Sequence, residues 1–167
     1  AVGPTVAWQQ FKNASNMTDK ASALSALVNC PAAQTFCHQA LELFEHEYAD
    51  ETLAMNLWLQ IQATSKLING LDRVKALMAH PAFSINNPNK ARSLLGAFCS
   101  ANPTNFHNKD GSGYLFLQQQ IIALNALNPQ VAARLVTPLT RWKKLPEPNR
   151  QLMRDALKQI ASHDGLV

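Results

Sequence analysis

Residues 86–135 read NNPNKARSLLGAFCSANPTNFHNKDGSGYLFLQQQIIALNALNPQVAARL, and this stretch decides the fold. It contains three Asn-Pro pairs, at Asn87-Pro88, Asn102-Pro103 and Asn128-Pro129. An Asn side chain can accept a hydrogen bond from a free backbone N–H at a helix start. Pro suits the first helical turn, where its missing N–H is not needed. Each pair therefore predicts the start of a helical segment.

Further turn and helix signals lie inside this stretch and on both sides of it. Asp110 to Gly113 predicts a turn that launches a long helix from Tyr114 to Asn128. Apolar residues at helical spacing predict the other elements. The predicted helices span about residues 18–29, 31–48, 51–63, 70–80, 88–100, 114–128, 129–138 and 146–160. No segment alternates apolar and polar residues for long enough to predict a sheet.

Short helices joined by tight turns stack into a solenoid more readily than into a four-helix bundle. The first and third Asn-Pro pairs are 41 residues apart, within the ~40–47-residue period of HEAT-type helix pairs. The sequence therefore predicts an all-α, curved α-solenoid of HEAT or armadillo type with about eight helices.

The predicted domain organisation is an extended N-terminal segment over residues 1–17, followed by a single helical domain over residues 18–167. A chain of 167 residues is long enough for one domain with a substantial core. The side chains predicted to face this core include Leu43, Leu53, Ala91, Leu94, Leu95, Phe98 and Leu127.

The net charge of +4 conceals an uneven distribution. Up to Glu51 there are six acidic and two basic residues, and beyond it five acidic and thirteen basic ones. A basic half can bind nucleic acid. Here the charges are dispersed at helical spacing with no interleaved aromatic residues, so solvated helix faces explain them better. We expect no nucleic-acid partner, and no membrane partner because no apolar run approaches ~20 residues.

Cysteine and histidine patterns predict no catalytic residue and no metal site in this chain. Cys30, Cys37 and Cys99 match no metal or redox spacing, and their odd number indicates free thiols in a reducing cytoplasm. His46-Glu47 begins like the zinc motif H-E-x-x-H, but Asp50 stands where the second His is required.

Three polar residues are candidates for binding. Gln130 and Arg134 are four residues apart, directly after an Asn-Pro helix start, so they share one helix face. Arg92 lies early in the other Asn-Pro helix, where the helix dipole favours acids instead. A guanidinium in such a place can bind a carboxylate through two parallel hydrogen bonds. Surface or interhelical salt bridges are the more ordinary explanation of the same residues.

Longer segments resemble a known family. HPAFSINNPNKARSLLGAF, NPTNFHNKDGSGYLFL and NPQVAARLVTPLTRWKKL are similar to the C-terminal helical domain of bacterial aminopeptidase N, and NASNMTDKASALSALV and LQIQATS match it in the same order. Members of this family are thermolysin-like zinc exopeptidases that remove N-terminal residues from peptides. The resemblance implies a fragment that lacks the H-E-x-x-H domain and the last short helix. The parent enzyme would hold zinc, and the fragment alone would bind none and be inactive.

The resemblance also implies roles. The domain would cap the catalytic domain of the same chain, enclose a cavity and restrict access to small peptide substrates in the cytoplasm. Gln130 would line the pocket for the first side chain of the substrate. Arg134 and Arg92 would offer positive charge to the peptide beyond the scissile bond, or to its terminal carboxylate. The alternative is a free-standing HEAT-like protein-interaction scaffold.

Overall fold

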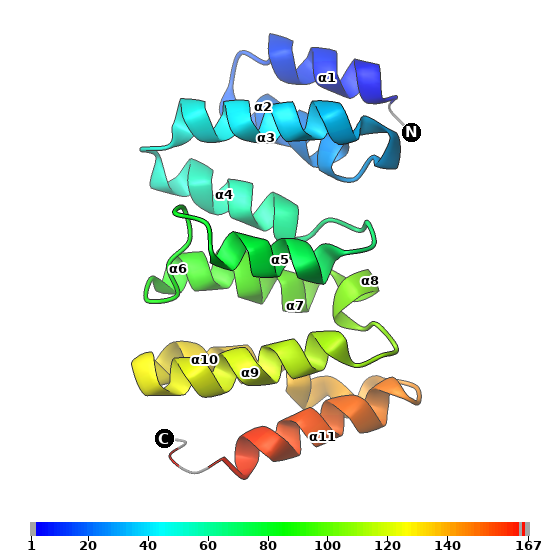
Figure 1. Ribbon diagram of the computed structural model, residues 1–167, viewed down its shortest axis with the longest axis vertical. Helices are drawn as coiled ribbons and strands as arrows, with labels where there is room; N and C mark the ends of the chain where they lie inside the picture. The colour runs from blue at the N-terminus through cyan, green and yellow to red at the C-terminus, as the bar shows by residue number, and fades with distance from the viewer. Residues whose placement is uncertain (1–2, 164, 166–167) are drawn as a thin grey trace.

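The computed structural model describes residues 3–163 and 165, and all regular structure within them is helical. The helices lie in layers stacked along one long axis, from α1 at one end to α11 at the other (Figure 1). The prediction of an all-α, repeat-like fold is confirmed. The elements are α1 (Pro4–Asn13), α2 (Met17–Val28), η1 (Pro31–Ala33), α3 (Gln34–Tyr48), α4 (Thr52–Ala63), α5 (Gly70–Met78), α6 (Pro88–Ala91), η2 (Arg92–Gly96), α7 (Ala97–Ala101), α8 (Pro103–Phe106), α9 (Ser112–Leu127), α10 (Pro129–Val136), η3 (Thr137–Lys144) and α11 (Asn149–Ala161).

All three predicted Asn caps are present. The side-chain oxygens of Asn87, Asn102 and Asn128 accept backbone N–H bonds from residues two or three positions later, at 3.0 to 3.3 Å. In each case Pro is the first helical residue. The local chemistry of these dipeptides therefore fixes where α6, α8 and α10 begin.

Asn102 does more than cap α8. Its side chain is fully buried, and its amide nitrogen donates to the backbone carbonyls of Ala63 at 3.0 Å and Ser65 at 2.8 Å. These carbonyls belong to the end of α4 and the loop after it, 39 and 37 residues earlier in the chain. One side chain thus joins two successive layers of the stack.

Asn105 continues this connection toward α5. Its amide nitrogen donates to the carbonyl of Leu67 at 2.9 Å, and its oxygen accepts the backbone N–H of Gly70 at 3.1 Å. A Cβ atom on Gly70 would lie 2.5 Å from the Asn105 amide nitrogen. Only glycine therefore lets the start of α5 approach the network this closely.

The prediction of an extended segment over residues 1–17 is wrong where the structure describes it, because residues 4–13 form α1. Pro4 occupies its first turn, and the buried residues Ala7 and Phe11 are one helical turn apart and face α2. Trp8 stacks on Phe36 with ring centroids 5.4 Å apart. The helix starts after Gly3 without the side-chain cap that marks the Asn-Pro helices, so its start lacks the signal on which the other predictions relied.

Three predicted core residues are instead exposed. Leu43, Leu53 and Leu127 keep 50%, 80% and 60% of their surface accessible, whereas Ala91, Leu94, Leu95 and Phe98 are fully buried as predicted. Leu53 lies in the first turn of α4 and Leu127 is the last residue of α9. Leu43 precedes the buried Phe44, so it lies about 100° away from it around the helix axis.

All three cysteines are free thiols. Cys37 and Cys99 are buried, and Cys30 is half-buried. In the described part of the chain, no helix combines the length and the apolar character that crossing a bilayer requires.

We predict that Asn102→Ala lowers the free energy of unfolding by about 2–4 kcal/mol, because it removes a helix cap and leaves two buried carbonyls without this donor. Urea denaturation followed by circular dichroism measures the change. Asn86→Ala is the matched control, since Asn86 is exposed and no side-chain hydrogen bond involves it in the described residues. Equal midpoints for the two variants would refute the structural role of the Asn102 network.

Candidate functional site

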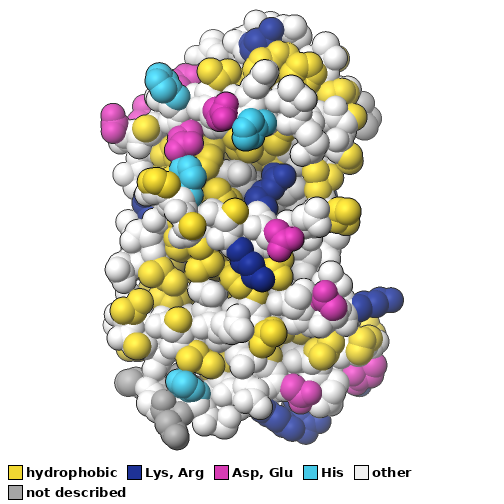
Figure 2. All heavy atoms as spheres, viewed as in Figure 1, with side chains coloured by type: hydrophobic (Ala, Val, Ile, Leu, Met, Phe, Trp, Pro, Cys, Tyr) yellow, Lys and Arg dark blue, Asp and Glu magenta, His cyan; other side chains and the backbone are white. Residues whose placement is uncertain are grey.

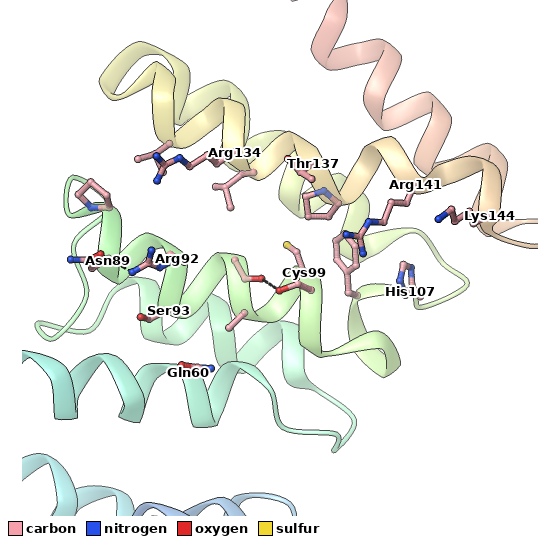
Figure 3. Close-up of a pocket in the computed structure, with 18 of the residues that line it drawn as sticks. Gln60, Asn89, Arg92, Ser93, Cys99, His107, Arg134, Thr137, Arg141 and Lys144 are labelled. Atoms are coloured by element: carbon pink, nitrogen blue, oxygen red, sulfur yellow. Dashed lines mark hydrogen bonds between the residues drawn. The ribbon is translucent and has the colours of Figure 1, made fainter. Parts of the chain in front are cut away.

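A cavity of about 710 Å³ lies between the layer of α6, η2 and α7 and the layer of α10 and η3 (Figure 3). Two segments of its wall depart from ordinary α-helical geometry. One is η2, which is a π-helix, and the other is η3, which is a 3₁₀-helix. These departures decide which side chains reach the cavity.

In η2 the backbone N–H of Ala97 bonds to the carbonyl of Arg92, five residues earlier. The sequence predicted a regular helix over residues 88–100. The structure differs from this prediction in the wider π-turn at residues 92–96. Arg92, Ser93 and Gly96 all line the cavity from this segment. Single π-turns within α-helices occur frequently at functional sites.

In η3 the chain completes a turn in three residues, so side chains three positions apart lie on one side. Pro138, Arg141 and Lys144 follow this spacing, and all three line the cavity. Pro138 has no N–H to give to a preceding carbonyl, so α10 cannot continue through it. The helix predicted over about residues 129–138 accordingly ends at Val136, where η3 begins.

The structure brings two of the three predicted binding residues together. Arg92 from η2 and Arg134 from α10 line the same cavity from facing layers (Figure 3). The Arg92 guanidinium donates to the side-chain oxygen of Asn89 at 2.8 Å. Gln130 is the second residue of α10, is exposed, and is not among the residues lining this cavity.

The cavity is strongly basic. Arg92, Arg134, Arg141 and Lys144 line it, and no Asp or Glu does. Within residues 3–163 and 165, none of these four side chains forms an ion pair. Acidic and histidine side chains gather instead toward α3 and the start of α4 (Figure 2). Unneutralised positive charge in a concave site raises the local concentration of anions.

Sequence reasoning missed Arg141, Lys144 and His107 as part of this site. A signal for the first two was available: they follow a helix-breaking Pro at positions three and six, which is the period of a 3₁₀-helix. No comparable local signal marks His107, because the loop between α8 and α9 brings it to the cavity through tertiary packing.

A hydrogen-bonded chain orients His107. The amide nitrogen of Asn149 donates to the hydroxyl oxygen of Tyr114 at 2.9 Å and to the backbone carbonyl of His107 at 2.8 Å. The Tyr114 hydroxyl in turn lies 2.7 Å from Nδ1 of His107. The Tyr114 hydroxyl accepts from Asn149 and donates its hydrogen to Nδ1 of His107. An Nδ1 atom that accepts carries no proton, so we assign the imidazole proton to Nε2.

Burial supports the neutral forms of these groups. It lowers the pKa of His107 and raises the pKa of the Tyr114 hydroxyl, so the imidazole stays uncharged and the phenol stays protonated near neutral pH. Burial also raises the pKa of the Cys99 thiol, which lines the cavity. A thiol of this kind is a poor nucleophile, so the site is suited to binding rather than to covalent chemistry.

We predict that stability falls as pH decreases from 7.5 to 5, in part because of His107. Its pKa is lower in the folded than in the unfolded chain, so the unfolded chain takes up the proton first, from about pH 6.5 downward. The stabilisation is therefore complete above that pH and is lost as pH falls. Urea denaturation across this range should give a flatter dependence for His107→Gln. His163→Gln, at an exposed position, is the control and should keep the native slope; an unchanged slope in His107→Gln would contradict the assignment.

Comparison with known proteins places this geometry in a family. A family profile described as "Domain of unknown function (DUF3458_C) ARM repeats" matches residues 1–167. Aminopeptidase N of Escherichia coli is 45% identical over 159 residues, which are 95% of this chain and 18% of that protein. Aminopeptidase N of Haemophilus influenzae is 40% identical over 99% of this chain and 19% of its own length.

A solved structure shows the same fold. The crystal structure of Legionella pneumophila aminopeptidase A in complex with aspartic acid matches with a TM-score of 0.90 and 36% identity, over 95% of this chain and 19% of that one. This chain therefore spans about a fifth of the length of these relatives. In the described residues, no group of three or more His, Cys, Asp or Glu side chains could hold a metal ion. The chain belongs to the DUF3458_C family of ARM-repeat domains, which forms the C-terminal part of bacterial aminopeptidase N.

Proposed function

We propose that this chain is the C-terminal ancillary domain of a zinc aminopeptidase of the aminopeptidase N type, which releases N-terminal residues from peptides. In that enzyme the domain caps the catalytic domain of the same chain, restricts access to small peptides and contributes residues that contact the substrate. The cytoplasm as its location is part of the same proposal. The observation that carries it is the pairing of Arg92 with Arg134 in one cavity without an acid, within a domain of this family.

The two guanidinium groups are suited to a carboxylate. Each presents planar N–H donors that match a carboxylate in a two-bond fork, and neither is neutralised within the described residues. Such a pair would hold the peptide beyond the scissile bond, or its terminal carboxylate, and so restrict its position relative to the catalytic groups.

The zinc of the parent enzyme would lie outside residues 3–163 and 165, within which no group of three or more His, Cys, Asp or Glu side chains could hold it. When bound, zinc would supply the activation of water and of the peptide carbonyl. The part of this domain in the reaction is therefore to bind and orient the peptide. The competing proposal, a free-standing scaffold, predicts a reading frame that does not continue upstream into an H-E-x-x-H domain.

In the full-length enzyme, Arg134→Ala should raise KM about tenfold for peptides with a free C-terminus, as expected for the loss of a charge-assisted hydrogen bond. Peptides with an amidated C-terminus should be affected much less, and kcat should change little for either class. Steady-state kinetics on matched acid and amide peptides test this. Lys158→Ala, which removes an exposed positive charge from α11, is the control. Equal losses for acid and amide peptides would rule out the carboxylate role.

Gln130→Ala should change the preference of the full-length enzyme among N-terminal residues, because the family resemblance assigns this exposed position to the pocket for the first side chain, apart from the cavity that Arg134 lines. The ratio of kcat/KM values for a set of aminoacyl anilides measures the preference, and zinc content should stay at the native level. An unchanged ratio across the set would remove Gln130 from the pocket for the first side chain.

A further inference from the structure

We propose that His107, Arg141 and Lys144 form a second carboxylate-binding subsite, at the end of the cavity away from Arg92 and Arg134. Its ligand is a carboxylate carried by a peptide too long to end at the first arginine pair. The identity of the ligand rests on the proposed function, whereas the subsite itself rests on the geometry of η3 and of the loop before α9. We call these three residues the distal cluster.

The first support is the placement of the two cations. The 3₁₀ spacing puts Arg141 and Lys144 on the same side of η3, facing the cavity. Figure 3 shows them with His107 at one end of the cavity, and Arg92 with Arg134 at the other. One cavity thus has two separate basic ends.

The second support is that the cations of the distal cluster are unused. Two neighbouring positive side chains do have a partner. Nζ of Lys143 and Cζ of Arg154 lie over the ring of Trp142, 5.6 and 5.5 Å from its centroid. Arg141 and Lys144 make no ion pair, side-chain hydrogen bond or ring contact with any other described residue. Two adjacent, unneutralised cations repel one another, and an anion between them removes that cost.

The third support is the donor on His107. The buried Tyr114 hydroxyl contacts Nδ1 of its ring, and Asn149 donates to that hydroxyl and to the His107 backbone carbonyl, so the orientation is fixed before any ligand arrives. The assigned tautomer leaves the Nε2–H group without a partner among the described residues. Guanidinium, ammonium and imidazole N–H groups are all donors, so the distal cluster is suited to an acceptor-only anion and unsuited to a metal cation.

The cavity volume of about 710 Å³ falls within the range of about 300–1,000 Å³ typical of ligand sites. In a peptide, the carboxylate comes either from the C-terminus or from an Asp or Glu side chain. Both sources present the same carboxylate oxygens. Whether the C-terminus or a side chain reaches the distal cluster therefore depends on the length and sequence of the peptide, and these two variables can be tested separately.

The test uses the full-length enzyme and peptides made resistant to cleavage by a reduced first peptide bond, with binding measured by isothermal titration calorimetry. Peptides of three to seven residues are compared in two arms. One arm pairs a free with an amidated C-terminus, and the other pairs Glu with Gln at each internal position of amidated peptides. At the length or position that reaches the distal cluster, we expect the carboxylate to tighten binding about tenfold.

The double variant Arg141→Gln with Lys144→Gln should abolish this preference while keeping the preference that Arg134 produces in shorter peptides. The matched control, Lys143→Gln with Lys158→Gln, removes the same charge outside the cavity and should bind like the native enzyme. Tyr114→Phe tests the positioning of His107. It should weaken the distal preference and convert the Nε2–H tautomer into a mixture, visible in the ¹⁵N chemical shifts of the imidazole.

An unchanged carboxylate preference in the Arg141 and Lys144 double variant would overturn the subsite and leave the proposed function standing. A lower melting temperature of that variant with native peptide selectivity would also overturn it, by showing that the two cations stabilise the enzyme without binding the peptide. A native enzyme that binds none of the peptides and hydrolyses none of their cleavable counterparts would overturn both.

Discussion

The buried amide of Asn102 is the interaction on which the arrangement of layers depends. A stacked fold of short helices must fix the spacing of each layer to the next, and apolar contacts alone resist sliding only weakly. The Asn102 side chain adds directional bonds to the carbonyls of Ala63 and Ser65 while it caps α8. Buried carbonyls left without donors are costly, so this register is strongly preferred over neighbouring ones.

The cavity follows from that register together with two local distortions. On one wall η2 is wound more loosely than an α-helix, and on the other η3 is wound more tightly. The first brings Arg92 to the cavity, and the second aligns Arg141 with Lys144. Regular α-helices over the same residues would place these side chains at different angles around their axes. The concentration of positive charge is thus a result of backbone geometry as much as of composition.

Much of the fold could be predicted because its signals are local. Asn-Pro caps act within three residues, so the starts of α6, α8 and α10 are visible in the sequence. The helix α1 was missed because it starts after Gly3 without a side-chain cap, and its two buried residues pack on α2. The same limit applies to the site. Arg92 and Arg134 were found from their positions and from family resemblance, whereas His107 depends on Tyr114 and Asn149, which are 7 and 42 residues away.

The two distorted segments also constrain how the chain can vary. In a loop, a residue can be gained or lost at little cost. In residues 92–96, one inserted or deleted residue would change the π-turn that brings Arg92 to the cavity. In residues 137–144, one residue inserted ahead of Pro138 would rotate every following side chain of η3 about its axis by about a third of a turn. Pro138, Arg141 and Lys144 would then leave the cavity together. Substitutions can change the side chains of this surface one position at a time, but the number of residues in these segments cannot change without altering the cavity.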